Sequence, residues 1–305
     1  MTTAPSTFRV PLPESLVDFL GKRVVDLPAP ELDGGLLREE VSAAYDRVRA
    51  ESPEAQIVFR RCRDLLNDPD GDGFAVLEVG PLLDHYGLDD GQKAATILLS
   101  WLGRPLRAFD KQPLWRPLGT NLDVDPTHTT GPEYNPLHID IVNASEPPDY
   151  SALLCVRPDP LGEGHSLVSQ VRRAVDRLSE GERAFLAEVA FHDGAFHDLT
   201  GVGREYNPFP VLDGLPAPEG FVRFTARMLP AMDLFDPHTS AARALERELI
   251  AEQKTFLLGF GDLIVVNQHL CAHGCSPLGE GQEEVPEERR RLLWQVHLRS
   301  AEPGA

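Results

Sequence analysis

The sequence predicts an α+β protein with a mostly β core, in which a β-barrel or jelly roll carries a helical N-terminal layer and helical insertions. Two observations lead to this prediction. Residues 13–66 place apolar side chains at three- and four-residue spacing, a period typical of amphipathic helices. After about residue 100, the sequence changes to short apolar segments separated by proline and glycine, which is typical of β-strands.

The first 100 residues are expected to be a mainly helical support for the core. Three helical segments are expected there, with the sequences ESLVDFLGKRVVDL, LLREEVSAAYDRVRA and EAQIVFRRCRDLL. The segment FAVLEVG is a strand candidate near residues 74–79. The segment GQKAATILLSWLG after it is expected to be a helix that ends at its last glycine.

Residues 100–300 are expected to contain the jelly-roll core. The strand candidates are SALLCVRP, VRFTARML, KTFLLGF, DLIVVN and RLLWQVHLR. A helix is expected near residues 166–190, and residues 198–220 are expected to form a lid-like loop because they are rich in glycine and proline without periodicity. Since no linker or fixed-period repeat divides the sequence, we expect residues 1–305 to form a single domain.

The composition argues against several classes of partner. Lysine and arginine number 29 against 48 aspartate and glutamate residues, so a net charge of −19 repels nucleic-acid phosphates and anionic membranes. No segment approaches the roughly 20 apolar residues of a membrane span, and the N-terminus lacks a signal-peptide pattern, so we expect a soluble, cytoplasmic protein. The four cysteines are too few for a disulfide scaffold and are expected to be free thiols.

The segment EYNPLHIDIVN contains the first candidate metal ligands. In an extended segment, residues two apart project to the same face, so His138 and Asp140 can reach one ion while Ile139 points away. A site of this kind needs a third protein ligand. The segment FGDLIVVNQHLCAHGC supplies the best candidate, because an apolar strand there leads to His273.

Two imidazoles and one carboxylate on one face of an octahedral ion leave three positions open, the arrangement of non-haem Fe(II) oxygenases. The open positions accept a bidentate co-substrate and O2. His138, Asp140 and His273 are therefore the candidate metal ligands and catalytic centre. Cys271 and Cys275 flank His273 and leave open an alternative in which soft ligands hold zinc.

The order of the motifs resembles the taurine dioxygenase and clavaminate synthase-like oxygenases over roughly residues 70–300. The pair HID is followed by GEGHS, then by VNQHLCAHG, then by an arginine-led strand. The resemblance implies a double-stranded β-helix of the cupin-like kind, with Fe(II) as cofactor and 2-oxoglutarate and O2 as co-substrates. It also implies that His138, Asp140 and His273 bind the iron. Related halogenases replace the carboxylate with a small residue, so Asp140 argues against halogenation.

The far carboxylate of 2-oxoglutarate needs a fixed cation, and a guanidinium binds it better than an ammonium does. The resemblance places such an arginine on the strand within ERRRLLWQVHLRS, and motif position favours Arg291. Arg289, Arg290 and Arg299 remain rivals. Some relatives carry a second arginine four residues after the first, where this chain has Gln295, so the details of carboxylate binding stay open.

Two further groups of residues are candidates for the site. Period-two geometry places Arg291, Leu293, Gln295, His297 and Arg299 on one face of the last strand. In GEGHS, Ser166 matches the family position whose hydroxyl binds the same carboxylate of 2-oxoglutarate.

Together these predictions describe an Fe(II)/2-oxoglutarate-dependent oxygenase. By the resemblance, it hydroxylates an unactivated carbon of a small molecule, such as an amino acid or a natural-product intermediate, and releases succinate and CO2. Desaturation or oxidative cyclisation with the same cofactors, a zinc-dependent hydrolase and a non-catalytic cupin-like binding protein are the alternatives. The acidic residues of the lid-like loop suggest a cationic substrate; they are Asp198, Glu205, Asp213 and Glu219. The sequence does not specify the oligomeric state.

Overall fold

The computed structural model describes residues 8–124, 129–194, 200–215, 217 and 220–300. The α-helices are α1 (Glu14–Val24), α2 (Glu39–Glu51), α3 (Pro53–Asn67), α4 (Gly80–Ser100), α5 (Val171–Asp176), α6 (Glu180–Leu186) and α7 (Pro237–Glu252). Short 3-10 helices are η1 (Ala226–Ala231), η2 (Gln282–Glu284) and η3 (Glu287–Arg289). Helices α1 to α3 form where the three- and four-residue spacing predicts them. Helix α4 begins earlier than expected and has non-helical geometry at Gly87.

The strands form one large sheet, one small sheet and one further pair. The large sheet has the order β1 (Arg9–Pro11), β4 (Phe74–Glu78), β13 (Asp262–Asn267), β8 (Tyr150–Arg157), β15 (Leu292–Arg299), β5 (Arg104–Leu106), β3 (Leu36–Leu37) and β2 (Leu32–Asp33), and β6 (Arg116–Gly119) also pairs with β15. The small sheet has the order β12 (Lys254–Phe256), β9 (Ser166–Gln170), β14 (Cys271–Cys275) and β7 (Asn135–His138). The remaining pair is β10 (Leu212–Asp213) with β11 (Phe221–Val222).

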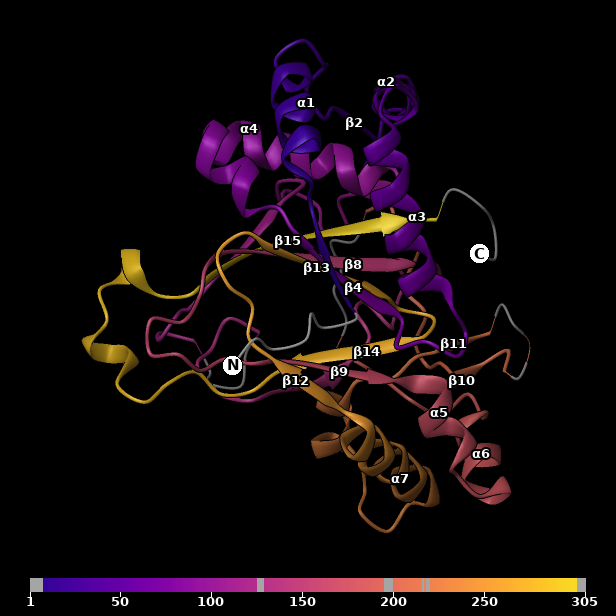
Figure 1. Ribbon diagram of the computed structural model, residues 1–305. Helices are drawn as coiled ribbons and strands as arrows, with labels where there is room; N and C mark the ends of the chain where they lie inside the picture. The colour runs from indigo at the N-terminus through magenta and orange to yellow at the C-terminus, as the bar shows by residue number, and fades with distance from the viewer. Residues whose placement is uncertain (1–7, 125–128, 195–199, 216, 218–219, 301–305) are drawn as a thin grey trace.

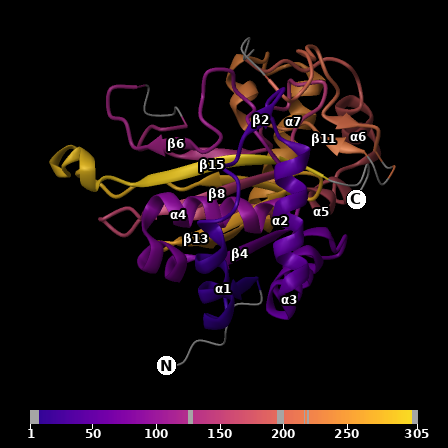
Figure 2. The ribbon, with the colours of Figure 1, turned by 90° about the horizontal axis from the view of Figure 1, so that it is seen from above.

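The two sheets face each other between two layers of helices (Figure 1). Helices α1 to α4 cover the outer face of the large sheet (Figure 2), and α5 to α7 lie outside the small sheet. Alternation along the strands explains these layers. In β13, Leu263 and Val265 join the core beneath α1 to α4, whereas Ile264 and Val266 pack between the sheets against Val168 of β9. The inner faces of the sheets therefore enclose the space in which β15 presents its polar residues.

Two of the expected elements are wrong in part. The helix expected near residues 166–190 begins only at Val171, because Ser166–Gln170 form β9 between β12 and β14. All five residues of β9 are buried, so no amphipathic period distinguishes this strand from a helix. The strand expected in VRFTARML ends at Val222 and is followed by η1.

Helix α7 was not anticipated from the sequence, although its start carries recognisable signals. Asp236 caps the helix, since its side chain accepts a hydrogen bond from the backbone N–H of His238, and Pro237 occupies the first turn. The helix packs Leu245 and Leu249 into the core on the outer side of the small sheet. It thus supports the strands that carry the site.

The described part of the loop expected at residues 198–220 is not wholly irregular, because β10 forms there and pairs with β11. Residues 198, 199, 216, 218 and 219 lie outside the described residues. The role of this loop as a lid stays a prediction.

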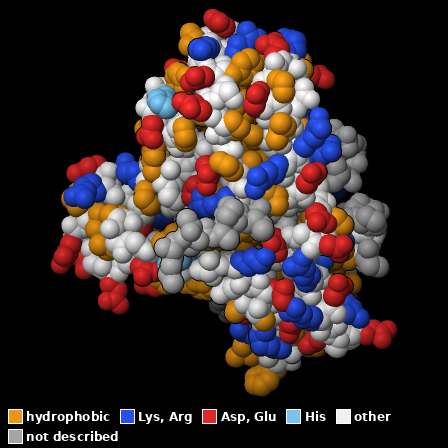
Figure 3. Space-filling view, in the orientation of Figure 1, with side chains coloured by type: hydrophobic (Ala, Val, Ile, Leu, Met, Phe, Trp, Pro, Cys, Tyr) orange, Lys and Arg blue, Asp and Glu red, His pale blue; other side chains and the backbone are white. Residues whose placement is uncertain are grey.

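Charged side chains of both signs occur on the surface of the molecule (Figure 3). Acidic and basic side chains are interspersed over the face shown in Figure 3. Among the described residues, no helix combines the length and the apolar character that crossing a membrane requires. The four cysteines are free thiols, as expected.

Candidate active site

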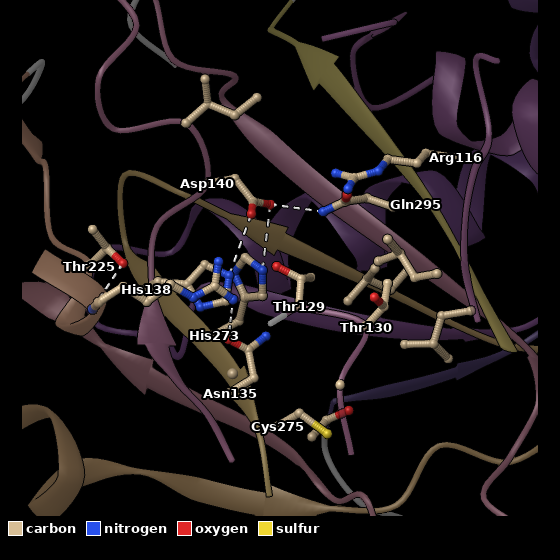
Figure 4. A pocket seen from close by; sticks show the side chains of 18 of the residues that line it. Arg116, Thr129, Thr130, Asn135, His138, Asp140, Thr225, His273, Cys275 and Gln295 are labelled. Atoms are coloured by element: carbon tan, nitrogen blue, oxygen red, sulfur yellow. Dashed lines mark hydrogen bonds and ion pairs between the residues drawn. The ribbon is translucent and has the colours of Figure 1, made fainter. Parts of the chain in front are cut away.

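His138 and His273 lie on neighbouring strands of the small sheet. Strands β7 and β14 pair in an antiparallel register that places His273 directly opposite His138. Gly274 permits this close approach, because a Cβ there would lie only 2.7 Å from the carbonyl oxygen of Asn135 on β7. Both histidines are buried, and the centroids of their rings lie 4.5 Å apart. Two residues distant in sequence therefore present their imidazoles to one point (Figure 4).

Asp140 lies in the turn after β7 and completes the group. Its Oδ1 lies 3.5 Å from Nε2 of His138, and its Oδ2 lies 3.5 Å from Nε2 of His273. The turn holds Ile141 at a φ of 57°, in the left-handed region that β-branched residues avoid. The backbone N–H of Asp140 donates to Oε1 of Gln268 at 2.6 Å, which helps to fix this conformation.

The three side chains fit a single metal ion, since their ligand atoms all lie within 4.8 Å of one another. Nδ1 of His138 donates to the carbonyl oxygen of Pro136 at 2.8 Å, so the lone pair on Nε2 faces Asp140. The carboxylate oxygens also present lone pairs, so all three side chains offer donor atoms to one cation. Two imidazoles and one carboxylate are the donor set of non-haem Fe(II) sites.

The alternative of a zinc site built on cysteine gains no support. The group of potential metal ligands found among the described residues contains neither Cys271 nor Cys275. His269, the other histidine close to these cysteines in the sequence, is paired through Nε2 with Asp149 at 2.8 Å.

Burial and the neighbouring charges shift the pKa values of Asp140 and His273. Burial raises the pKa of Asp140, but the imidazoles of His273, His138 and His297 outweigh this and hold that pKa well below its usual range. Burial lowers the pKa of His273 to about 4, although the charge of Asp140 opposes this shift. The carboxylate is therefore ionised and the imidazole of His273 is neutral, as a metal requires.

Acidification is expected to destabilise the metal-free protein through His273. The unfolded chain binds a proton there near pH 6.5, whereas the folded protein binds it only near pH 4. The stability that the neutral imidazole contributes is therefore complete above pH 6.5 and is lost as the pH falls toward 4. Between pH 7 and pH 5, the wild type should lose about 2 kcal/mol more of its free energy of unfolding than His273→Asn does. Urea denaturation with a chelator present measures this difference, and equal losses would contradict the prediction.

Strand β15 provides two further contacts to Asp140. Gln295 donates from Nε2 to Oδ2 of Asp140 at 3.2 Å, and Nε2 of His297 lies 3.2 Å from the same oxygen. Both side chains are buried on the inner face of the strand, as its alternation predicts. The sequence places them on this face, but it does not show that they reach the carboxylate. They fix the orientation of Asp140 toward the two histidines.

Replacing His297 is expected to weaken metal binding through Asp140. His297→Phe keeps an aromatic ring beside Phe109, whose ring centroid lies 6.3 Å away, but removes the contact with the carboxylate. Loss of such an outer contact typically costs about 10–100-fold in metal affinity. Anaerobic titration with Fe(II) measures the change, and His85→Phe on the exposed side of α4 is the control. An unchanged affinity in His297→Phe would show that His297 does not orient the ligand.

Arg291 and Ser166 lie together in another part of the same cavity. Ser166 begins β9 and is paired in register with Cys275 of β14, and both residues line the cavity together with Arg291. The arginine side chain passes the GEGHS turn, where a Cβ on Gly164 would lie 3.6 Å from Cδ of Arg291. The fold thus brings together the two residues that motif position selects for 2-oxoglutarate.

The rival arginines lie elsewhere. Among the described residues that line the cavity, Arg291 is present and the other three candidates are not. Arg290 donates to a backbone carbonyl oxygen of the preceding turn, and Arg299 donates to the carbonyl oxygen of Pro147. Arg289 is exposed.

His138, Asp140 and His273, called here the metal group, line one cavity of about 380 Å³ together with Arg291. This volume lies at the small end of the range for ligand sites, about 300–1,000 Å³. Two more arginines line it, Arg116 on β6 and Arg227 on η1, and neither stands in a recognisable sequence motif. Arg116 reaches the cavity only because β6 pairs with β15, and Arg227 lies in a segment expected to be a strand.

Comparisons with known proteins agree with this arrangement. The family model described as taurine catabolism dioxygenase TauD, TfdA family matches residues 107–296. A crystal structure of asparagine oxygenase in complex with Fe(II), 2S,3S-3-hydroxyasparagine and succinate is similar, with a TM-score of 0.75 and 21% identity over 96% of this chain and 93% of that chain. The non-heme iron oxygenase OrfP in complex with Fe and alpha-ketoglutaric acid has a TM-score of 0.68 and 18% identity, over 96% and 94% of the two chains. Among curated protein sequences, no significant match was found.

Proposed function

The chain belongs to the taurine catabolism dioxygenase TauD, TfdA family of non-haem iron, 2-oxoglutarate-dependent oxygenases, and we propose that it hydroxylates an unactivated carbon of a small molecule. Succinate and CO2 are the co-products. The observation that carries this proposal is the buried group of His138, Asp140 and His273 in the same cavity as Arg291. An amino acid is the favoured substrate class, because the similar structures contain hydroxyasparagine and, for OrfP, (3S)-hydroxy-L-Arg.

His138, Asp140 and His273 would hold Fe(II) and leave three positions open for 2-oxoglutarate and O2. Iron in this place supplies the oxidation of a C–H bond, coupled to decarboxylation of 2-oxoglutarate. The residues of this chain orient the ligands: His138 is fixed by the carbonyl oxygen of Pro136, and Asp140 by Gln295.

Arg291 would bind the far carboxylate of 2-oxoglutarate with two charge-assisted hydrogen bonds, and the hydroxyl of Ser166 would donate another. Support comes from their shared position in the cavity, close to Cys275 and on the side of the GEGHS turn. Because the cavity must also hold 2-oxoglutarate, its volume favours a small substrate.

The arrangement of sheets supports the finer description of the fold. A large and a small sheet face each other across a shared core, which fits a double-stranded β-helix of the jelly-roll, cupin-like kind. The helices cover the outer faces of both sheets instead of forming a core of their own, which favours a single domain.

The expectation of a cationic substrate loses its support from the acidic loop. Asp213 forms an ion pair with Arg223 at 2.7 Å, and Glu205 accepts a hydrogen bond from Asn207 at 3.0 Å. Neither acidic residue is among the described residues that line the cavity. The other two acidic residues, at positions 198 and 219, lie outside the described residues.

Turnover with a panel of L-amino acids and related small acids tests the proposed reaction. We expect at least one compound to stimulate succinate formation, only when both O2 and 2-oxoglutarate are supplied, and to gain one oxygen atom by mass spectrometry. A product that lacks two hydrogens without added oxygen would indicate desaturation or cyclisation instead, since the outcome depends on substrate placement of about an ångström. Turnover that persists without O2 and 2-oxoglutarate would contradict the proposal and indicate a hydrolase.

A further inference from the structure

Arg116 and Arg227 line the cavity, but neither is needed to bind iron or 2-oxoglutarate in the proposed function. Both line the cavity together with the metal group. Strand β6 pairs with β15 in a register that places Arg116 opposite Gln295, the residue that donates to Asp140. The guanidinium of Arg116 accordingly lies beside Gln295, toward the side of Asp140 (Figure 4). These cations therefore adjoin the metal group.

Neither guanidinium is neutralised by an ion pair within the described part of the chain. Cζ of Arg116 lies 4.7 Å from the centroid of the Phe109 ring, a cation–π contact that supplies no negative charge. Arg227 donates to Oδ1 of Asn135, while its Nε is buried without a hydrogen-bond partner among the described residues. A buried donor without a partner is costly, so an acceptor supplied by a ligand would be favourable.

The electrostatic environment of both arginines is unfavourable without a bound anion. Burial lowers the pKa of Arg116 and of Arg227, and the positive charge of Arg227 lowers that of Arg116 further. The charge of Asp140 opposes these shifts. Once a metal ion binds Asp140, however, the carboxylate is neutralised by that ion and no longer balances the arginines.

The other charges of the loaded cavity balance one another. Fe(II) and Arg291 together carry three positive charges, and Asp140 with the 2-oxoglutarate dianion carries three negative charges. Asp193 is the remaining acidic residue among the described residues that line the cavity. It can offset only one of the two arginines, Arg116 and Arg227. As far as the described residues are concerned, the part of the cavity left for the substrate therefore has a net positive charge.

We propose that Arg116 and Arg227 form a subsite that binds a carboxylate group of the substrate, which makes the substrate class a small organic acid, amino acids included. This inference rests on the proposed function, because it assigns 2-oxoglutarate to Arg291. Guanidinium–carboxylate hydrogen bonds are among the strongest in proteins, and two such groups fix the position of the acid relative to the metal. Asn135, which accepts a hydrogen bond from Arg227, and Thr225 add polar groups to the lining of the cavity (Figure 4).

Trifluoroacetate is a probe that tests the subsite without knowledge of the substrate. The protein is loaded with Ni(II) and saturated with 2-oxoglutarate, so that Arg291 is occupied, and the ¹⁹F line width of trifluoroacetate is measured. We expect broadening, and a larger effect with paramagnetic Ni(II) than with diamagnetic Zn(II), because the subsite adjoins the metal. Trifluoroethanol, which has the same CF₃ group without the charge, should show no comparable broadening.

Matched variants assign the broadening to the two arginines. The double variant Arg116→Gln, Arg227→Gln should bind trifluoroacetate at least about tenfold more weakly, since it loses both charge-assisted contacts. Arg60→Gln, on the exposed face of α3, should behave like the wild type. Absence of broadening in the wild type, or equal broadening in the double variant, would overturn the proposal. So would a loss of 2-oxoglutarate binding in the double variant, because that would assign these arginines to the co-substrate.

The visible absorption band of the anaerobic Fe(II)–2-oxoglutarate complex separates failure of the subsite from failure of the proposed function. If the band forms in the wild type and trifluoroacetate does not bind, the carboxylate subsite alone is wrong. If the band does not form, the proposed function is wrong and the subsite falls with it.

Discussion

Asp140→Ala is expected to lower the affinity for Fe(II) by more than about 100-fold and to abolish substrate-coupled succinate formation. Asp140 is the anionic member of the group, and both Gln295 and His297 orient its carboxylate. Loss of an outer contact to a ligand costs about 10–100-fold in affinity, so loss of the ligand itself should cost more. Anaerobic Fe(II) titration and succinate assays at fixed iron concentration measure the two effects.

Asp149→Asn is the matched control for this change. Asp149 is also a partly buried, ion-paired aspartate, but its partners are His269 and Arg299 and it does not line the cavity. We expect this variant to retain its iron affinity even if its free energy of unfolding falls. Similar losses of iron affinity in both variants would mean that Asp140 acts through general stability and not as a ligand.

Arg291→Gln is expected to raise the KM for 2-oxoglutarate by about 100-fold, with a smaller change in kcat. The substitution would remove the two charge-assisted hydrogen bonds proposed for Arg291; at the low end of about 1.5 kcal/mol each they total about 3 kcal/mol, which corresponds to roughly 100-fold. Steady-state assays with varied 2-oxoglutarate measure the effect. Arg291→Lys should recover part of the loss, because the charge returns without the paired geometry.

Arg289→Gln is the control for the arginine cluster, since Arg289 is exposed and does not line the cavity. Its KM for 2-oxoglutarate should equal that of the wild type. A larger increase of this KM in Arg116→Gln than in Arg291→Gln would contradict the assignment of Arg291 to the co-substrate.

The sequence predicts elements best where their period is clear. Helices α1 to α3 and strands β8, β13 and β15 form where three- to four-residue spacing or apolar runs indicate them. The misassigned strand β9 is buried on both faces, so its residues show no period that separates it from the helix that follows. The pairing of β6 with β15 joins segments far apart in the chain, so its register cannot be predicted from the local sequence.

Some residues of the candidate site can be predicted from sequence motifs, and others cannot. His138, Asp140 and Arg291 stand in ordered motifs, and the fold places them at one cavity. Arg116 and Arg227 stand in no motif, so only their position in the cavity identifies them as candidate binding residues. For Gln295 and His297, the sequence predicts only that they share one face of the last strand. Their contacts with the Asp140 carboxylate depend on how the two sheets pack, which the sequence does not show.

An anaerobic titration of the Fe(II)-loaded protein with 2-oxoglutarate tests the assignment of this cavity to iron and its co-substrate. We predict a weak visible absorption band that saturates at one 2-oxoglutarate per chain, is absent in Asp140→Ala and requires much higher 2-oxoglutarate concentrations in Arg291→Gln. Absence of this band in the wild-type protein, or its persistence at full intensity in Asp140→Ala, would contradict the assignment.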